Sequence, residues 1–426
     1  MLNKASASIG LLVLIGEMCQ ALSLPTITPK GTASFIQNSS TPRGSPFGTT
    51  PAVPSPTSEL AQPPPGASIA HFEAGRAVII ESIRMVDATT GWAIASGGGA
   101  GDHVVYTGDG GETWRDATPP EPESPPGEPR KMASAYFLED LAWVAYYTGA
   151  FTGQTGTVIW RTRDRGNSWR PSALAAHGGI DWVNLHFVDS QHGWVMIFFE
   201  EGGMNNQYVA LYRTSDGGET WEFLFDPSAS GDIGDIQSCP KTGMAFEAPA
   251  TGWVARDCHG LYDRPFIDRT EDGGRIWQSQ ELPPPEGRPD PFSGPYCGLT
   301  SLALLQPQVL RLAMECILDY GPPILAEHYL YATDDGGMTW RAVPYPGGSV
   351  QFVNADVGWA LGREIYQTRD GGQTWTKVKT VGWDGQFDFV NEEVGWAVAR
   401  FGEEVALVKT TDGGRTWLQI QPRSEP

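Results

Sequence analysis

The chain has 426 residues and carries 50 acidic against 29 basic side chains, so its formal net charge at pH 7 is −21. The basic residues are scattered, and no run of them occurs in the sequence. Because phosphate backbones and anionic membrane surfaces repel such a chain, the composition argues against nucleic acid as a partner and against direct binding to anionic membranes.

The N-terminal segment has the pattern of an export signal. Lys4 precedes an apolar run from Ile9 to Ile15, and a polar stretch ends at Ser23, after which we expect cleavage. The apolar run is too short for a typical transmembrane helix. Cys19 leaves lipid anchoring open, although the residues before it match a lipobox poorly, and an uncleaved anchor also stays open. We therefore predict a signal peptide at residues 1–23 and an extracellular or cell-envelope location.

Residues 24–67 have the composition of a disordered linker. They are rich in Pro, Ser and Thr and poor in large apolar side chains, so they cannot bury enough apolar surface to fold. Length alone would allow two or three domains in this chain. The repeats that follow argue instead for one folded domain, which we place at residues 68–426.

One eight-residue phrase occurs seven times in the remainder of the chain. Every copy has Thr at its first position, Asp at the third, Gly at the fifth and Trp at the eighth. The copies begin at Thr107, Thr162, Thr214, Thr270, Thr333, Thr368 and Thr410. Consecutive copies lie roughly 35 to 63 residues apart, which indicates an array of similar supersecondary units.

The phrase has the chemistry of a tight turn between two β-strands, and we call it the repeat turn. The Asp carboxylate can accept hydrogen bonds from turn amides, and the Gly residues tolerate positive φ. Arg165 replaces the first Gly in the second copy. Because the turn uses the carboxylate, we predict a structural role for the seven aspartates. They are Asp109, Asp164, Asp216, Asp272, Asp335, Asp370 and Asp412.

A Gly-Trp pair marks another strand upstream of most repeat turns. The pairs are Gly91-Trp92, Gly193-Trp194, Gly252-Trp253, Gly358-Trp359 and Gly395-Trp396, with Ala142-Trp143 as a variant. Each is followed by alternating or continuous apolar residues, which indicates a strand leaving a turn. One unit then holds four antiparallel strands, and seven such units predict a single all-β, seven-bladed β-propeller.

These motifs resemble those of a known group of propellers. The repeat turns resemble the Asp-box, or bacterial neuraminidase repeat, of sialidases, sortilin-type receptors and xyloglucanase-type hydrolases. Together with the Gly-Trp strand they are most similar to the photosystem II stability/assembly factor-like propellers. The resemblance covers nearly everything after residue 70 and implies the propeller architecture. It leaves the function open, because these relatives include enzymes, receptors and assembly chaperones.

Four of the five cysteines lie in the predicted propeller. Cys239 and Cys258 flank one predicted hairpin, and Cys297 and Cys316 flank another with the same sequence separation. Residues equidistant from the turn of an antiparallel hairpin face each other across the ladder. We therefore predict the disulfides Cys239–Cys258 and Cys297–Cys316, which fit an oxidising compartment. Neither a Cys-x-x-Cys motif nor clustered His residues support the rival metal site, so we expect no metal and no cofactor.

Glycoside hydrolysis is the alternative to a binding role, because sugar-cleaving enzymes share the Asp-box. The Arg-Ile-Pro signature of sialidases does not occur in this chain, and the xyloglucanase type uses two facing propellers where only one fits here. Acidic residues do fall in predicted loops between second and third strands, and their separation decides whether two could form a hydrolase pair. They are Glu200, Glu201, Asp257, Asp263, Asp319 and Glu327. We assign no catalytic residue and expect a non-catalytic protein.

The favoured function is a rigid, monomeric scaffold that binds a protein or glycan partner. In a four-stranded blade, the loops between the second and third strands lie on the face opposite the repeat turns. We predict that these loops are long in blades two to five, at residues 147–157, 199–208, 257–266 and 319–329. Long loops on a rigid scaffold are where recognition concentrates. We expect partner contacts on this face through the aromatic residues Phe151, Phe199, Tyr262 and Tyr329.

Overall fold

The computed structural model describes most of the chain after residue 70. The described ranges are 71–96, 102–120, 132–146, 156–175, 180–199, 207–226, 236, 239–257, 265–285, 296–321 and 324–425. The predicted signal peptide and linker, residues 1–23 and 24–67, lie outside the described residues. The regular secondary structure in the described ranges consists of β-strands. These ranges contain no helix long and apolar enough to cross a membrane.

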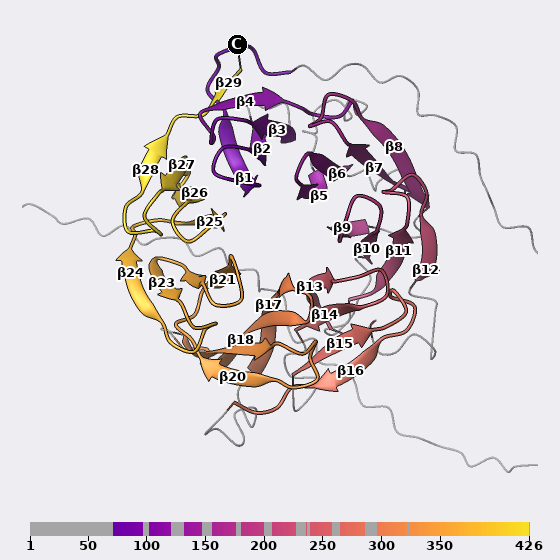
Figure 1. Ribbon diagram of the computed structural model, residues 1–426, viewed down its shortest axis with the longest axis vertical. Helices are drawn as coiled ribbons and strands as arrows, with labels where there is room; N and C mark the ends of the chain where they lie inside the picture. The colour runs from indigo at the N-terminus through magenta and orange to yellow at the C-terminus, as the bar shows by residue number, and fades with distance from the viewer. Residues whose placement is uncertain are drawn as a thin grey trace, which may run out of the picture. The chain divides into compact units, whose positions relative to one another are not determined.

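Seven antiparallel sheets of four strands each form a ring, which confirms the predicted seven-bladed β-propeller (Figure 1). In each blade the first strand lies innermost and the fourth lies outermost. The core lies between neighbouring blades, because one face of a sheet packs on the preceding blade and the other face packs on the following blade. The second strand of blade three, for example, is buried along its whole length.

The strands of the first four blades have the following bounds. Blade one contains β1 (Ile79–Met85), β2 (Gly91–Ser96), β3 (Asp102–Thr107) and β4 (Thr113–Asp116). Blade two contains β5 (Met132–Leu138), β6 (Leu141–Tyr146), β7 (Gly156–Thr162) and β8 (Arg170–Ala175). Blade three contains β9 (Ile180–Phe187), β10 (Gly193–Phe199), β11 (Val209–Thr214) and β12 (Glu222–Phe225). Blade four contains β13 (Lys241–Phe246), β14 (Gly252–Arg256), β15 (Phe266–Thr270) and β16 (Gln278–Glu281).

The remaining three blades follow the same order from the inner to the outer strand. Blade five contains β17 (Tyr296–Gln306), β18 (Val309–Asp319), β19 (Leu325–Thr333) and β20 (Arg341–Pro344). Blade six contains β21 (Ser349–Phe352), β22 (Gly358–Leu361), β23 (Glu364–Thr368) and β24 (Thr376–Thr380). Blade seven contains β25 (Asp384–Phe389), β26 (Gly395–Phe401), β27 (Glu404–Thr410) and β28 (Leu418–Ile420).

The repeat turns are held by their own side chains. In the first copy, the Thr107 hydroxyl donates to the Asp109 carboxylate at 2.9 Å and accepts from the Gly111 amide at 3.0 Å. The other oxygen of Asp109 accepts from the Thr113 hydroxyl at 2.6 Å. The same Thr-to-Asp hydrogen bond measures 2.7–2.9 Å in all seven copies. Arg165 in the second copy adopts a positive φ of 61°.

The tryptophans of the Gly-Trp pairs join neighbouring blades. Trp194 in blade three stacks on Phe246 of blade four with ring centroids 3.6 Å apart. Its indole N–H donates to the Gly273 carbonyl in the blade-four repeat turn at 2.9 Å. The same donation to the repeat turn of the following blade runs from Trp143 to Gly217, from Trp359 to Gly413 and from Trp396 to Gly110. Each such tryptophan therefore ties two blades together.

The ring is closed by the C-terminal residues. β29 (Arg423–Ser424) adds a fifth strand to blade one by pairing in parallel with β4. The Ser424 amide also donates to the Arg76 carbonyl at 2.8 Å, and the Val78 amide donates to the Pro422 carbonyl at 3.0 Å. Segments from both ends of the propeller therefore lie side by side next to β4 (Figure 1).

One predicted disulfide is present between described residues. Cys297 and Cys316 face each other in the β17–β18 ladder and form a disulfide, which confirms that prediction. Cys297 lies nine residues before the last ladder pair, Gln306–Val309, and Cys316 lies seven residues after it. Two register shifts, at Leu299/Ser301 and Leu304/Gln306, each add one residue to β17 and bring the cysteines opposite each other. Cys239 is also disulfide-bonded. Cys258, its predicted partner, lies outside the described residues.

The loop between the second and third strands of blade five is shorter than predicted. β18 continues to Asp319 and β19 already begins at Leu325, so the loop is residues 320–324 rather than 319–329. Glu327, which we expected in the loop, therefore lies within β19 and pairs with β18. The prediction was wrong because β18 and β19 continue their ladder almost to the turn, and this pairing satisfies backbone groups that a loop would expose.

Candidate functional site

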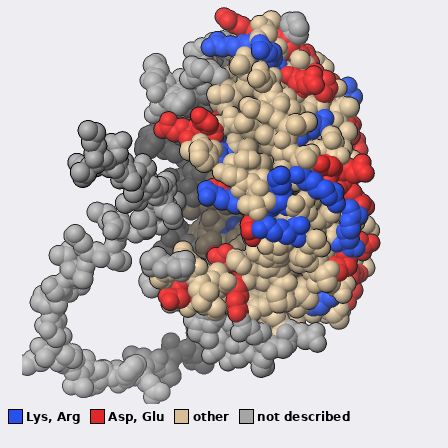
Figure 2. Space-filling view, turned by 90° about the vertical axis from the view of Figure 1, so that its left-hand side faces the viewer, with Lys and Arg blue, Asp and Glu red and all other residues tan. Residues whose placement is uncertain are grey.

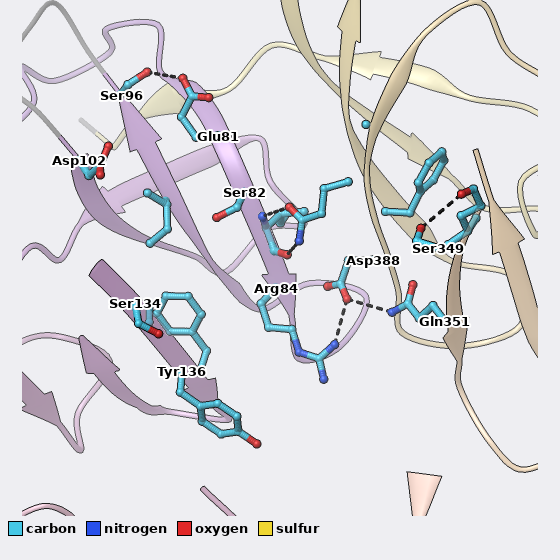
Figure 3. Close-up of a pocket in the computed structure, with 18 of the residues that line it drawn as sticks. Glu81, Ser82, Arg84, Ser96, Asp102, Ser134, Tyr136, Ser349, Gln351 and Asp388 are labelled. Atoms are coloured by element: carbon cyan, nitrogen blue, oxygen red, sulfur yellow. Dashed lines mark hydrogen bonds and ion pairs between the residues drawn. The ribbon is translucent and has the colours of Figure 1, made fainter. Parts of the chain in front are cut away.

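The inner strands of blades one, two, six and seven line an open cavity of about 1080 Å³ (Figure 3). The lining takes consecutive residues from each inner strand. Its polar side chains include Ser82 and Arg84 in β1, Ser134 and Tyr136 in β5, Ser349 and Gln351 in β21, and Gln386 and Asp388 in β25. The cavity wall therefore mixes hydroxyl and amide groups with apolar side chains such as Ile83, Phe137 and Phe387.

Asp388 is a buried carboxylate in the cavity wall. It accepts hydrogen bonds from Arg84 Nη1 at 3.0 Å and from Gln351 Nε2 at 3.1 Å (Figure 3). It also accepts a hydrogen bond from the Met85 amide. Burial raises the pKa of Asp388 above its ordinary value, although the Arg84 charge opposes that rise. The contacts join blades one, six and seven, so this carboxylate holds inner strands together.

Glutamine side chains replace missing ladder hydrogen bonds between neighbouring inner strands. The Gln386 amide group accepts from the Ile83 N–H and donates to the Ile83 carbonyl, both at 2.9 Å. Gln351 accepts from the Phe389 N–H at 2.9 Å and donates to the Phe389 carbonyl at 3.3 Å. These bonds fix the inner strands of blades one, six and seven relative to one another.

Glu81 is the second carboxylate of the cavity with well-defined partners. It accepts from the Ser96 hydroxyl at 2.7 Å and from Arg400 at 2.9 Å. Partial burial raises the pKa of Glu81, but these hydrogen bonds and the Arg400 charge outweigh that effect and leave the pKa below its ordinary value. Glu81 therefore stays ionised at neutral pH, whereas the general acid of a glycosidase must hold a proton at that pH.

The loop carboxylates named from the sequence do not line this cavity in the described part of the chain. Asp257 follows β14, Asp319 ends β18 and Glu327 lies in β19, whereas the lining comes from other blades. Glu200, Glu201 and Asp263 lie outside the described residues. Within the described ranges, no group of three or more His, Cys, Asp or Glu side chains is arranged to hold a metal ion.

A second candidate surface lies at the end of blade five. β17 and β18 have 11 residues each and β19 has 9, and β19 pairs with β20 only from Tyr329 onward. The strands therefore extend past the outer strand at the connection between the second and third strands, on the face opposite the repeat turns. We call this extension the blade-five arm and define it by residues 296–299, 315–321 and 324–328.

Five large apolar side chains are exposed on the blade-five arm. Tyr320, Ile324 and Leu325 are 59%, 60% and 56% exposed, and Tyr296 and Leu318 are 45% and 42% exposed. The rings of Tyr296 and Tyr320 meet edge to face with centroids 5.5 Å apart. Exposed apolar side chains that gather in one place are typical of interaction sites, whereas scattered ones are not.

Two of the four predicted aromatic anchors are not available to a partner. Phe199 and Tyr329 are only 7% and 3% exposed. Phe199 packs in the core between blades two and three, and Tyr329 packs in the core between blades four and five. The prediction was wrong because both residues belong to strands rather than loops, Phe199 at the end of β10 and Tyr329 in the middle of β19, so their rings fill space between sheets. Phe151 and Tyr262 lie outside the described residues.

Blades six and seven carry exposed basic and acidic side chains that pair with each other. Figure 2 views the ring from the side of β24 and β28 and shows Lys and Arg gathered beside Asp and Glu. Arg363 pairs with Asp384 at 2.7 Å, and Arg369 pairs with Glu392 at 2.7 Å. Because exposed pairs such as these neutralise each other, they do not form a basic surface for phosphate.

Comparison with known proteins shows the fold. No protein-family model and no curated protein matches the chain. Among solved structures, YCF48 bound to a D1 peptide has 16% identity and a TM-score of 0.48, and the match covers 83% of this chain and 99% of that one. The GH74 xyloglucanase of Xanthomonas campestris has 14% identity and a TM-score of 0.50, over 84% of this chain and 55% of that one. The sialidase of Trypanosoma rangeli has 14% identity and a TM-score of 0.38, over 79% of this chain and 54% of that one.

Proposed function

We propose that this chain is an exported, non-catalytic scaffold that binds a partner protein through the face opposite its repeat turns. The observation that carries the proposal is the blade-five arm, which exposes five large apolar side chains on that face. Removing such side chains from water on contact with a partner is the main driving force of protein association. The arm therefore has the chemistry of a docking surface.

The setting of the arm supports a binding role. The Cys297–Cys316 disulfide joins β17 to β18 within the arm. The rest of β18 is anchored in the ring, where Leu310, Leu312 and Met314 are fully buried. A rigid support lowers the entropy lost on binding, because fewer side chains and backbone segments must be ordered when the partner arrives.

The family and the location are part of the same proposal. We assign the chain to the Asp-box propellers, close to the photosystem II stability/assembly factor-like group. The Thr-to-Asp hydrogen bond present in all seven repeat turns supports that assignment. The Cys297–Cys316 disulfide supports export, since disulfides persist in oxidising compartments.

Glycoside hydrolysis is the second candidate, and one observation favours it. Asp388 is a buried carboxyl group in a large cavity, and burial raises its pKa, as the general acid of a glycosidase requires. Its oxygens already accept from Arg84, Gln351 and Met85, so we rank this candidate second. Release of reducing sugar from a polysaccharide panel by the wild type, lost in Asp388→Asn, would support it.

The experiment for the binding proposal compares two matched variants in capture from the envelope fraction of the native host. In the arm variant, Ile324→Ser and Leu325→Ser remove exposed apolar groups without disturbing the core. In the control variant, Met338→Ser changes a side chain that is 72% exposed in the repeat turn of the same blade. The immobilised bait is the full chain in each case, and the captured proteins are identified and quantified by mass spectrometry.

The two variants should differ clearly. We expect the arm variant to lose about tenfold or more of the specific capture, as substitution of interface anchors does, while Met338→Ser keeps it. Both variants should unfold at the wild-type temperature, because the altered side chains are exposed. Equal capture by wild type and arm variant, or loss of capture in Met338→Ser, contradicts the proposal.

A further inference from the structure

The charge around the exposed apolar end of the blade-five arm is negative. Glu315 and Asp319 lie on β18 beside the exposed side chains, and both are themselves solvent-accessible. Burial raises the pKa of Tyr320, and the charges of Tyr296, Asp257 and Glu315 raise it further. These carboxylates therefore act electrostatically on the ring at the centre of the arm.

The described part of the arm offers no full positive charge to balance these carboxylates. His328 is its basic side chain, and its Nε2 atom already lies 3.0 Å from Glu315. Arg311 on β18 is 3% exposed at the other end of the blade, where it bonds to Asp334 and to the Ala355 carbonyl. A partner that approaches the arm therefore contacts apolar side chains with negatively charged carboxylates beside them.

We propose that the arm binds a polypeptide segment in which apolar side chains lie next to Lys or Arg. This inference rests on the proposed function and names the chemistry of the partner. The apolar residues of the segment cover Leu318, Ile324 and Leu325, and its cations lie near Glu315 and Asp319. Opposite charges at the rim of an apolar contact raise the association rate and select against acidic partners.

Two other occupants fit these groups less well. A second copy of the chain would bring one acidic arm against another, because the whole chain carries a net charge of −21. A neutral glycan would gain from stacking on Tyr296 and Tyr320, but it would gain little from the aliphatic Leu318, Ile324 and Leu325 or from the carboxylates. Both occupants remain outcomes of the test.

The test is selection of peptides from a displayed random library on the immobilised full chain. The same library is selected on Ile324→Ser/Leu325→Ser, which removes the apolar groups, and on Glu315→Gln/Asp319→Asn, which removes the charges but keeps hydrogen-bond acceptors. Phe401→Ser is the matched control, since Phe401 is 69% exposed on the same face of blade seven. A glycan array probed with the full chain and analytical centrifugation complete the set.

We expect to select peptides that bind wild type and Phe401→Ser but bind Ile324→Ser/Leu325→Ser about tenfold more weakly. The sequences of these peptides should combine large apolar residues with Lys or Arg. Their affinity for wild type should fall as salt is raised, and Glu315→Gln/Asp319→Asn should reduce that salt dependence. Arm-dependent peptides that are neutral or acidic would overturn the inference and leave the proposed function standing. If no selected peptide depends on the arm, or if an arm-dependent glycan or dimer appears instead, the inference fails together with the proposed protein partner.

Discussion

The aspartate of each repeat turn accepts hydrogen bonds from residues of the same turn. Asp370 accepts from the Thr368 hydroxyl at 2.8 Å and from the Thr374 amide and hydroxyl at 2.9 and 2.6 Å. Partial burial raises the pKa of Asp370, but these hydrogen bonds outweigh that effect and lower the pKa below its ordinary value. The stabilisation is therefore complete above the unfolded-state pKa of about 3.9 and is lost as pH falls through the lower folded-state value.

Replacing this carboxylate should destabilise the protein moderately. Asp370→Ala should lower the free energy of unfolding by about 1 kcal/mol at pH 7, because exposed turn amides exchange their partner for water. The difference from wild type should shrink as the pH is lowered below about 3.9. Denaturant unfolding at several pH values measures this, with the exposed Asp356→Ala in the same blade as control. An equal effect of both substitutions would contradict the assignment.

His186 of β9 links blades three and four, because its Nε2 atom lies within hydrogen-bond distance of both the amide and the carbonyl group of Phe246. Its Nε2 atom accepts from the Phe246 amide at 3.0 Å. Burial lowers the pKa of His186 to about 4, because the charged ring loses its hydration. In the unfolded chain the pKa is about 6.5, so the unfolded state binds more protons between these values and stability falls as pH is lowered from about 6.5 to about 4.

His186→Gln should keep the link between blades three and four and remove this dependence of stability on pH. Gln351 of blade six already bonds to both backbone groups of Phe389 in blade seven, so His186→Gln can bond to Phe246 in the same way. We expect the unfolding temperature of wild type to drop relative to His186→Gln as the pH is lowered from about 6.5 to about 4. Parallel curves for the two proteins over this range would show that His186 does not titrate as the structure requires.

At the scale of strands, the sequence predicts the strands whose ends are marked by a motif. The repeat turns and Gly-Trp pairs place two turns in nearly every blade, and the strands between them follow from apolar alternation. No such motif marks the end of β18, so the long β18–β19 ladder and the exposed Ile324 and Leu325 were missed. The burial of Phe199 and Tyr329 was missed because it depends on where a strand ends, which composition does not determine.

The arm should depend on its disulfide. Cys297 and Cys316 are 19 residues apart, and loss of the bridge should cost about 3 kcal/mol on the chain-entropy model. We expect Cys297→Ser/Cys316→Ser to unfold at a lower temperature and to expose amides of β17 and β18 in the arm to faster hydrogen exchange. An unchanged unfolding temperature and unchanged exchange in these strands would mean that the bridge contributes nothing to the arm.

At the scale of the whole molecule, side chains join blades that are distant in sequence. Arg84 and Asp388 are 304 residues apart, yet they form one wall of the cavity. The sequence predicts the number of blades but not which residues meet across the ring, because that depends on the register between sheets and on closure by β29. The composition of the cavity therefore could not be predicted.

The interblade tryptophans should contribute most to the stability of the ring. Trp359 is fully buried, stacks on Phe389 with centroids 3.9 Å apart and donates to the Gly413 carbonyl of blade seven. Trp359→Ala should cost about 3–5 kcal/mol because it leaves a cavity between blades. Trp359→Phe should keep the stack on Phe389 and cost less than Trp359→Ala. Its missing hydrogen bond should cost about 1 kcal/mol, in addition to the free energy lost with the smaller buried area. Equal costs for both variants in calorimetry would contradict this role.

The most direct measurement of the binding claim is hydrogen exchange of the full chain with and without its captured partner. The account predicts slower exchange at residues 315–321 and 324–328 of the blade-five arm when the partner is bound. Exchange at the repeat turns should stay unchanged, since they lie on the opposite face. Protection confined to the repeat turns, with the arm exchanging as fast as in the free protein, would contradict the account.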